Sequence, residues 1–322
     1  MPENIPVSEW IGYLEDDYLA TFIKDGGATI KFAITDNELN STLKNLLRSK
    51  GEELGYVVVD INAEKSRVHM PQDLFFAMSR QVDWRLTTRK FILRLAAELH
   101  YRINDVDVTS DGNLLEAIAD ENNLDLQSIL FDLRPQFQEK VLRNRSMAKD
   151  FRVAMSHLCQ LEGTWEDQGY YGGQAIIDWL TGSNTRVSSV KPFSIYNPVN
   201  RTTAKYFLES ALYWVHDVGF AGTLILLDNS RVTVSNRPTD GSRYYTRPMM
   251  MEHYQLLREF IDSAERLTAT MMITISTSEF LDIEPSPRSR GIGAYQALQT
   301  RIMDDVKDRN LINPIASVIR LD

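Results

Sequence analysis

Residues 222–228 read Gly-Thr-Leu-Ile-Leu-Leu-Asp and are followed by Asn229 and Ser230. Four apolar residues in succession, without alternation of polar and apolar side chains, are typical of a strand buried on both faces inside a parallel sheet. An Asp at the carboxyl end of such a strand points into the crevice where α/β folds bind ligands. The stretch therefore predicts an α/β protein with a candidate ligand site at Asp228. A plainer interpretation, in which Asp228 caps the next turn, is equally compatible with these residues.

Four further candidate strands lie on either side of this stretch. They cover residues 28–34, 56–61, 270–276 and 315–321. An amphipathic helix over residues 9–23 precedes the first strand, and a second helix, N-capped by Thr35 or Asp36, leads to the next one. Residues 72–182 instead show helical periodicity. We expect a five-stranded parallel α/β sheet in three parts: a first βαβ region at 1–71, a helical insertion between strands two and three at 72–182, and the remaining core at 183–322.

The composition is that of an ordinary globular protein of 322 residues. The formal net charge of -9 argues against a surface broadly devoted to nucleic acid. A basic stretch at residues 140–152 is interpreted as a solvated helix face, because acidic residues are interleaved with it. The single cysteine, Cys159, excludes an intramolecular disulfide and a cysteine-based metal site. No secretory signal and no membrane-spanning apolar run is found, so we expect a cytoplasmic protein.

Residues 35–38 connect the first strand to its helix, which is where a P-loop would lie. That loop needs glycines to turn backbone N–H groups onto phosphates, a Lys for the β/γ-phosphates and a hydroxyl for Mg²⁺. The connection reads Thr-Asp-Asn-Glu, without glycine or lysine and with two acids that would repel a polyphosphate. No Gly-Lys-Ser or Gly-Lys-Thr occurs in the chain, and Gly26-Gly27 precedes the strand. If the fold is of the P-loop type, its phosphate cradle has been lost.

Several stretches together resemble a known family. They are residues 26–32 (Gly-Gly-Ala-Thr-Ile-Lys-Phe), 68–70 (Val-His-Met), 74–77 (Leu-Phe-Phe-Ala), 219–222 (Gly-Phe-Ala-Gly), 226–228 (Leu-Leu-Asp), 258–263 (Arg-Glu-Phe-Ile-Asp-Ser) and 295–302 (Tyr-Gln-Ala-Leu-Gln-Thr-Arg-Ile). With the order of elements, they resemble the BREX-type ATP-binding proteins, the BrxD-like P-loop family of bacterial anti-phage defence islands, which are related to the AAA+ group. The resemblance spans most of the chain and implies the AAA+/ASCE-like sheet of the additional-strand P-loop ATPases.

The resemblance also implies roles for single residues. Asp228 matches the Mg²⁺-binding Asp of the Walker B strand, and Asn229 replaces the catalytic Glu with a neutral side chain. Thr277 or Ser276 matches the sensor position, and Arg301 matches a helix-borne arginine near a γ-phosphate or a subunit boundary. The Walker A loop is absent, and no C-terminal lid is found between the fifth strand and Asp322. These departures imply a degenerate nucleotide site with negligible ATP hydrolysis, because Lys and Mg²⁺ normally stabilise the transferring phosphoryl group.

Two functions are compatible with this resemblance. The preferred one is a catalytically inactive AAA+-like scaffold or adaptor (a pseudo-ATPase) that holds no cofactor. It contacts other defence-system proteins, a homologous ATPase subunit among them, in a homo- or hetero-oligomer. The alternative is an ATPase with an unconventional or shared site, in which Thr29 or Lys31 binds ATP and Mg²⁺ together with Asp228. The position of Lys31 within the strand, before the crevice, disfavours this alternative.

A third hypothesis is DNA binding by loops at the carboxyl edge of the sheet, over residues 230–247 and 279–293. Six arginines cluster there: Arg231, Arg237, Arg243, Arg247, Arg288 and Arg290. A different α/β protein, outside this family, is the remaining alternative. The histidines are scattered singly, and the sequence contains no catalytic triad, paired carboxylates or His cluster that would support a competing chemistry.

Overall fold

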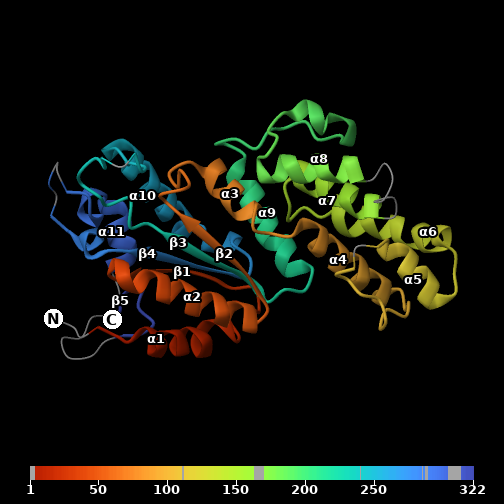
Figure 1. Ribbon diagram of the computed structural model, residues 1–322, viewed down its shortest axis with the longest axis horizontal. Helices are drawn as coiled ribbons and strands as arrows, with labels where there is room; N and C mark the ends of the chain where they lie inside the picture. The colour runs from red at the N-terminus through yellow and green to blue at the C-terminus, as the bar shows by residue number, and fades with distance from the viewer. Residues whose placement is uncertain are drawn as a thin grey trace. The chain divides into compact units, whose positions relative to one another are not determined.

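The computed structural model describes residues 4–110, 112–162, 170–239, 241–284, 286, 289–303 and 313–322. These residues form two compact units. Residues 1–78 and 220–322 make up the first, which contains the sheet, and residues 79–219 make up the second, which is helical. We call them the α/β unit and the helical unit (Figure 1). The helical unit is inserted in the chain between the second and third strands, as the sequence predicts.

The α/β unit contains five parallel strands in the order β2-β3-β4-β1-β5. Their bounds are β1 (Ala28–Ile34), β2 (Tyr56–Asn62), β3 (Gly222–Asp228), β4 (Thr270–Ser276) and β5 (Val318–Arg320). Every residue of β3 and β4 is buried, which confirms the interpretation of residues 222–228 as an interior strand. Because all strands are parallel, their carboxyl ends lie at one edge of the sheet. Asn62, Asp228 and Ile275 are consequently neighbours in register there.

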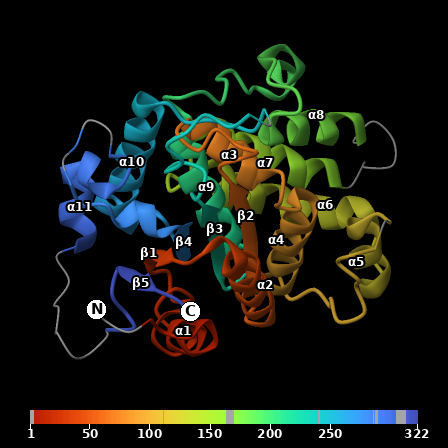
Figure 2. The same cartoon turned by 60° about the vertical axis from the view of Figure 1, so that its left-hand side comes forward.

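Helices cover both faces of this sheet (Figures 1 and 2). On one face, α1 (Val7–Leu14), a π-helical turn (Glu15–Leu19) and α2 (Asn37–Glu53) bury apolar side chains against Leu224, Leu226 and Ile273. On the other face, Tyr254 of α10 (Arg247–Asp262) and Phe280 contact Phe32 of β1 through a chain of ring contacts. The other α-helices in the described part of the unit are α3 (Pro71–Ser79) and α11 (Gln296–Met303). The apolar faces of α1, α2 and α10 therefore pack on the sheet, as expected of a parallel sheet that is covered on both faces.

Gly222 begins β3 in a conformation that only glycine adopts easily, with φ of +147°. A Cβ atom at this position would lie 2.1 Å from the carbonyl oxygen of Ala269. The absence of a side chain thus lets β3 start directly beside the residue that leads into β4.

The helical unit contains α4 (Trp84–Glu98), α5 (Leu114–Asn122), α6 (Leu126–Gln136), α7 (Lys149–Leu161), α8 (Tyr170–Thr181) and α9 (Ala204–Asp217). A π-helical segment (Phe137–Leu142) follows α6 directly. The unit covers residues 79–219, whereas the sequence predicts an insertion over residues 72–182; residues 72–78 belong instead to the α/β unit. The difference at the C-terminal end arises because Trp214 of α9 contacts the Phe91 ring and donates a hydrogen bond to Thr87, both on α4. These contacts between residues distant in sequence assign α9 to the helical unit.

Candidate functional site at the carboxyl edge of the sheet

The connection between β1 and α2 ends in a helix cap. The Asp36 carboxylate accepts a hydrogen bond of 2.8 Å from the backbone N–H of Leu39. The N–H of Thr35 is also used, because it donates to the carbonyl of Ser276. An N-terminal helix turn with free N–H groups attracts phosphate. Here a carboxylate of the chain itself caps the N-terminus of α2, so a phosphate approaching it would meet a negative charge.

Asp228 is buried, and both of its carboxylate oxygens accept hydrogen bonds. Oδ1 accepts from the backbone N–H of Ser230 at 3.1 Å and from its hydroxyl at 2.6 Å. Oδ2 accepts from the amide groups of Asn40 and Asn62, at 2.9 and 3.3 Å. The Oδ1 contacts therefore agree with the plainer interpretation, in which Asp228 caps the following turn. The Oδ2 contacts place the same carboxylate in a wider polar network.

Lys44 of α2 supplies the positive charge of this network. Its Nζ atom lies 3.3 Å from Oδ2 of Asp228 and 3.5 Å from Oδ2 of Asp60. The side chain of Lys44 is 18% exposed and that of Asp228 only 5%, so the ion pair is largely removed from water. Arg48 approaches Asp60 from the next turn of α2, at 4.0 Å. Asn40, Lys44 and Arg48 follow one another at four-residue spacing, which places them on one helix face.

Sequence reasoning missed Asn40, Lys44, Asp60 and Asn62. A signal for them was present. Asp60 and Asn62 alternate along β2, so they share the face on which Asp228 lies in register with Asn62. The spacing of Asn40 and Lys44 matches that of the buried Leu43 and Leu47, which mark the side of α2 that packs on the sheet. What the sequence alone did not supply was the order of strands, because β2 and β3 are separated by the whole helical unit.

The residues at the other predicted positions of the site have neutral side chains. Asn229 is 2% exposed, and within the described residues neither its Oδ1 nor its Nδ2 atom has a hydrogen-bond partner. Ser276 is also buried, whereas Thr277 reaches the surface of a pocket, where its hydroxyl lies 3.5 Å from that of Thr233. The structure thus brings Asp228, Asn229 and Thr277 to the same edge of the sheet. It supplies no carboxylate at position 229 that would act as a general base.

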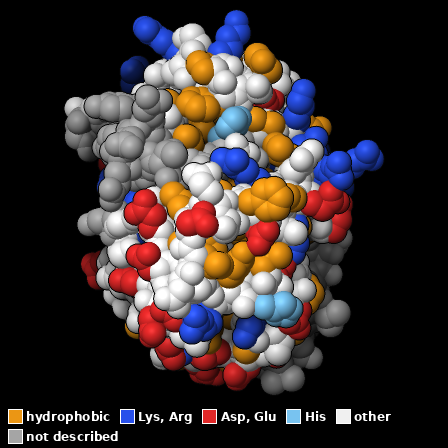
Figure 3. All heavy atoms as spheres, turned by 90° about the vertical axis from the view of Figure 1, so that its right-hand side faces the viewer, with side chains coloured by type: hydrophobic (Ala, Val, Ile, Leu, Met, Phe, Trp, Pro, Cys, Tyr) orange, Lys and Arg blue, Asp and Glu red, His pale blue; other side chains and the backbone are white. Residues whose placement is uncertain are grey.

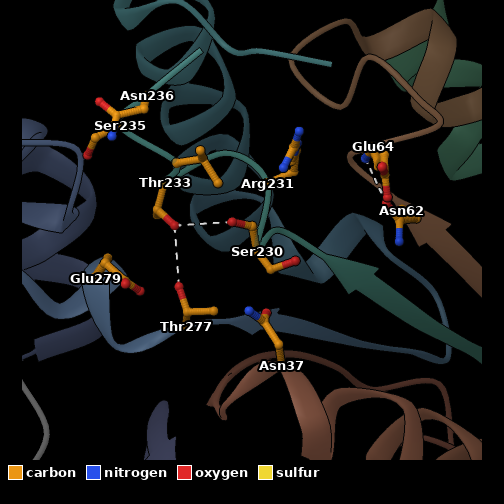
Figure 4. Close-up of a pocket in the computed structure, with 11 residues that line it drawn as sticks. Asn37, Asn62, Glu64, Ser230, Arg231, Thr233, Ser235, Asn236, Thr277 and Glu279 are labelled. Atoms are coloured by element: carbon orange, nitrogen blue, oxygen red, sulfur yellow. Dashed lines mark hydrogen bonds between the residues drawn. The ribbon is translucent and has the colours of Figure 1, made fainter. Parts of the chain in front are cut away.

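A pocket of about 440 Å³ opens at this edge (Figure 4). Side chains that follow β2, β3 and β4 form its walls, together with Asn37 at the start of α2. Most of them are hydroxyls and amides: Ser230, Thr233, Ser235 and Thr277, and Asn37, Asn62 and Asn236. The charged side chains are Arg231, Glu64 and Glu279. The pocket is therefore polar, with carboxylates of Glu64 and Glu279 in positions that disfavour a polyanion.

These residues do not match a Mg²⁺-nucleotide site of the Walker type. Mg²⁺ takes oxygen ligands at about 2.0–2.1 Å, in near-octahedral geometry. At Asp228 the ammonium of Lys44 and two amide groups already contact Oδ2, so a metal ion would have to displace them. Among the described residues, no group of three or more His, Cys, Asp or Glu side chains has the arrangement of a metal site.

Buried histidines support the loop behind this edge. His253 of α10 is fully buried and its Nδ1 atom lies 3.1 Å from the carbonyl oxygen of Val68. Tyr245 accepts a hydrogen bond from the N–H of Val68 and contacts the His69 ring. Burial lowers the pKa of His253 to about 4 and also lowers the pKa of His69. Both imidazoles are therefore neutral near pH 7, as expected of structural histidines.

The arginines predicted to bind DNA are mostly engaged with the protein backbone. Arg290 donates to the carbonyls of Val232 and Tyr245, and Arg247 donates to those of Ser286 and Ser289. Two further arginines behave in the same way, Arg231 toward the carbonyl of Arg243 and Arg243 toward those of Glu64 and Lys65. Arg237 is exposed, and Arg288 lies outside the described residues. These guanidinium groups hold loops together.

Lys31 and Arg301 lie away from Asp228. Lys31 is buried within β1 and donates to the Tyr18 hydroxyl and to the carbonyl of Ile315. Thr29 is the second residue of the same strand, at the opposite edge of the sheet from the pocket. Arg301 of α11 pairs with Asp262 at the end of α10, which leads back to the amino end of β4. The structure therefore does not bring these three side chains to the carboxyl edge.

No helix within the described ranges is long and apolar enough to cross a lipid bilayer. Searches of curated proteins and of solved structures give no match for this chain. A family model described as BREX system ATP-binding protein BrxC/D matches residues 113–322, which is more than half of the chain. The match begins after β2, so Asp36 and Lys44 precede it, whereas Asp228 and Asn229 lie within it. The chain is thus a member of the BREX system ATP-binding protein BrxC/D family.

Proposed function

We propose that this chain is a scaffold or adaptor subunit of a bacterial anti-phage defence complex, and that its α/β unit does not hydrolyse ATP. The family match supports the role in a defence system. The sheet order supports a P-loop-type origin of the α/β unit, because β4 lies between β1 and β3 as an additional strand. Its partners on this proposal are other defence-system proteins, a homologous ATPase subunit among them.

The observation that carries the proposal is the ion pair between Lys44 and Asp228. In a working site the Asp after this strand binds Mg²⁺, which bridges the nucleotide phosphates. Here an ammonium group lies 3.3 Å from the same carboxylate and fulfils the electrostatic role of the cation within the fold. Two further features agree with it. The Asp36 carboxylate caps the helix that would receive the phosphates, and Asn229 is neutral where a general base is needed.

Calorimetric titration with Mg²⁺-ATP, together with a phosphate-release assay, tests this proposal. We expect no saturable heat at millimolar nucleotide, no rise in melting temperature, and no phosphate release above the buffer blank, because a ligand that binds only the native state must stabilise it. The decisive control is Asp228→Asn, which removes the metal-binding charge. Hydrolysis by the wild type that disappears in Asp228→Asn would refute the proposal.

A second candidate function is nucleotide binding at an unconventional or shared site. The pocket of about 440 Å³ favours it, because Asn37, Ser230 and Thr277 lie around it at the ends of three different elements. Saturable binding of ATP without hydrolysis, weakened by Thr277→Val, would support this candidate over the first. Repeating the titration with the other subunits of the defence system present tests whether a neighbouring chain completes the site.

A further inference from the structure

Two segments of the helical unit carry basic residues without any acidic residue. Residues 140–149 contain Lys140, Arg143, Arg145 and Lys149, and residues 179–208 contain Arg186, Lys191, Arg201 and Lys205. Neither segment contains Asp or Glu, although the whole chain has a formal net charge of -9. The positive charge of these two segments is therefore not balanced by acids within them, in a protein that is acidic as a whole.

The fold brings these two segments together. The N–H of Tyr196 donates at 3.0 Å to the carboxylate of Asp150, which directly follows the first segment, and the N–H of Ala148 donates at 2.8 Å to the hydroxyl of Ser210, just after the second segment. A pocket of about 370 Å³ lies between the segments. Arg145 and Lys149 line it from the first segment, and Asn197 and Tyr206 line it from the second. We call the surface formed by residues 140–149 and 179–208 the basic patch.

The cations of the basic patch differ in their availability. Lys140 pairs with Glu98 and Arg143 pairs with Glu139. In the part of the chain that the structure describes, Arg145, Lys149, Arg186 and Lys191 are exposed and form no ion pair. The acids beside the pocket are Asp150, which is buried and accepts bonds from Tyr196 and Asn197, and Glu209.

A space-filling view agrees with this separation of charge. On the face shown in Figure 3, Lys and Arg side chains gather toward the upper end, while Asp and Glu side chains occupy the middle and lower parts, together with further Lys or Arg side chains. The upper end is where Figure 1 draws the segment between α8 and α9. The upper part of this face is thus more basic than the middle and lower parts.

Two tyrosines project from the same surface. Tyr196 is 57% exposed and Tyr206 is 56% exposed, which is unusual for large aromatic side chains in a unit with an extensive buried core. Tyr206 lines the pocket, and Tyr196 precedes Asn197, which also lines it. Exposed aromatic rings beside unpaired cations are the combination that binds single-stranded nucleic acid, because bases stack on the rings while the cations contact phosphates.

We propose that the basic patch binds single-stranded nucleic acid, with Arg145, Lys149 and Lys191 at the phosphates and Tyr196 and Tyr206 stacking on bases. This inference is independent of the state of the Asp228 site. It also replaces the interpretation of residues 140–152 as a merely solvated helix face. Glu139 pairs with Arg143 and the buried Asp150 accepts hydrogen bonds from Tyr196 and Asn197, so neither acid pairs with Arg145 or Lys149 among the described residues.

Fluorescence anisotropy with the full chain and a labelled oligothymidylate tests the proposal. The oligonucleotide has about 20 nucleotides, which exceeds the ~4–16 nucleotides that single-strand-binding domains cover. We expect binding that weakens between about 50 and 200 mM salt, because bound phosphates release counterions. The double variant Arg145→Glu/Lys149→Glu should weaken binding at least about tenfold and lower the salt slope by about 1.4, the value for two phosphate contacts on a single strand.

A matched control is available on the same unit. Arg102 and Arg134 are exposed and lie outside both segments of the basic patch, and Arg102→Glu/Arg134→Glu changes the net charge by the same amount. We expect this control to retain the wild-type affinity within about twofold, which corresponds to a change well below 1.4 kcal/mol. Equal losses in the two double variants would overturn the proposal, as would the absence of salt-dependent binding by the wild type.

Tyrosine variants test the stacking separately from charge. Tyr196→Ala and Tyr206→Ala should each weaken binding about tenfold, whereas the corresponding Phe variants should retain it, because stacking needs the ring and not the hydroxyl. An oligouridylate of the same length distinguishes RNA from DNA as the natural ligand. Duplex DNA that binds as tightly as the single strand, or Ala variants that bind like wild type, would contradict the assignment.

Discussion

Arginine and lysine side chains cluster in two regions of this protein and are used in opposite ways. In the loops at the carboxyl edge of the α/β unit, four of the arginines donate hydrogen bonds to backbone carbonyls, as Arg290 does to Val232 and Tyr245. In the basic patch of the helical unit, Arg145 and Lys149 are exposed and line a pocket. The sequence shows two comparable clusters of positive charge. Only the folded structure shows which of these cations bind the protein's own backbone and which are exposed to solvent.

This difference has a physical origin in the backbone. Loops of irregular structure leave carbonyl groups without partners, and buried carbonyls must be satisfied. A guanidinium group offers five N–H donors in a fixed geometry, so one arginine can bind carbonyl groups of two loop segments at once. Arg145 lies in the turn before α7 and is exposed, so its guanidinium group remains available to an external anion. A cluster of arginines that donate to backbone carbonyls is therefore weaker evidence for nucleic-acid binding than exposed cations beside exposed aromatic rings.

The largest effect is expected from the internal charge at Asp228. Lys44→Met leaves a buried carboxylate without its cation, and breaking such a pair costs about 3–5 kcal/mol. We expect the free energy of unfolding to fall by about 3 kcal/mol in urea titrations, because Lys44 is partly exposed. The double variant Lys44→Met/Asp228→Asn should regain part of this loss, since it removes the uncompensated charge. A loss below about 1 kcal/mol in Lys44→Met would mean that the pair is not an internal substitute for a cation.

Acidification is a second way to place a charge inside the α/β unit, because it protonates the buried His253. The pKa of His253 is lowered from 6.5 to about 4 by burial. Between these two pH values the unfolded chain binds a proton that the folded protein does not. The contribution of His253 to the free energy of unfolding is therefore complete above pH 6.5 and is lost as the pH falls toward 4. The loss amounts to about 2–3 kcal/mol for this group, and His69 adds to it in the same direction.

Melting temperatures measured between pH 7 and pH 4 check this expectation. His253→Gln keeps a donor for the Val68 carbonyl and cannot titrate, so its melting temperature should depend less on pH in this range. Parallel curves for the wild type and His253→Gln would show that the buried imidazole is not responsible.

An intermediate effect is expected for a single loop arginine. Arg290→Ala removes hydrogen bonds to two carbonyls and the contact with the Tyr244 ring. We expect a loss of about 2 kcal/mol of stability, the range for hydrogen bonds that involve a charged group. Arg237→Ala, at an exposed arginine of the same loop region, is the matched control and should be nearly neutral. Similar losses in the two variants would contradict the structural role of Arg290.

The smallest effect on stability is expected in the basic patch. Arg145→Ala and Lys149→Ala should each change the free energy of unfolding by less than about 0.5 kcal/mol, because both side chains are exposed and lack ion-pair partners among the described residues. Urea titrations of the two single variants measure this. A substantial destabilisation would indicate that these cations, like those of the α/β loops, hold the fold together.

The strands of the sheet were largely predictable from the sequence. β1, β3 and β4 have the expected bounds, and β2 extends one residue further, to Asn62. Each is a run of apolar or β-branched residues next to a turn signal, which is a local property. β5 is shorter than expected, because only Val318–Arg320 pair with β1; on the other side of β5, Leu321 forms an isolated parallel bridge with Ile5. The helix expected over residues 9–23 is α1 followed by a π-helical turn.

The sequence by itself thus determined the α/β class, the position of Asp228 at a strand end, and the absence of a glycine-rich phosphate loop. The tertiary structure alone decided that Lys44, Asn40 and Asn62 contact Asp228, and that the loop arginines donate to carbonyls while Arg145 and Lys149 face outward. The physical reason is range. Hydrophobic periodicity, caps and missing motifs are read within a few residues, whereas the partner of a charge depends on strand order and on segments that are distant in the chain.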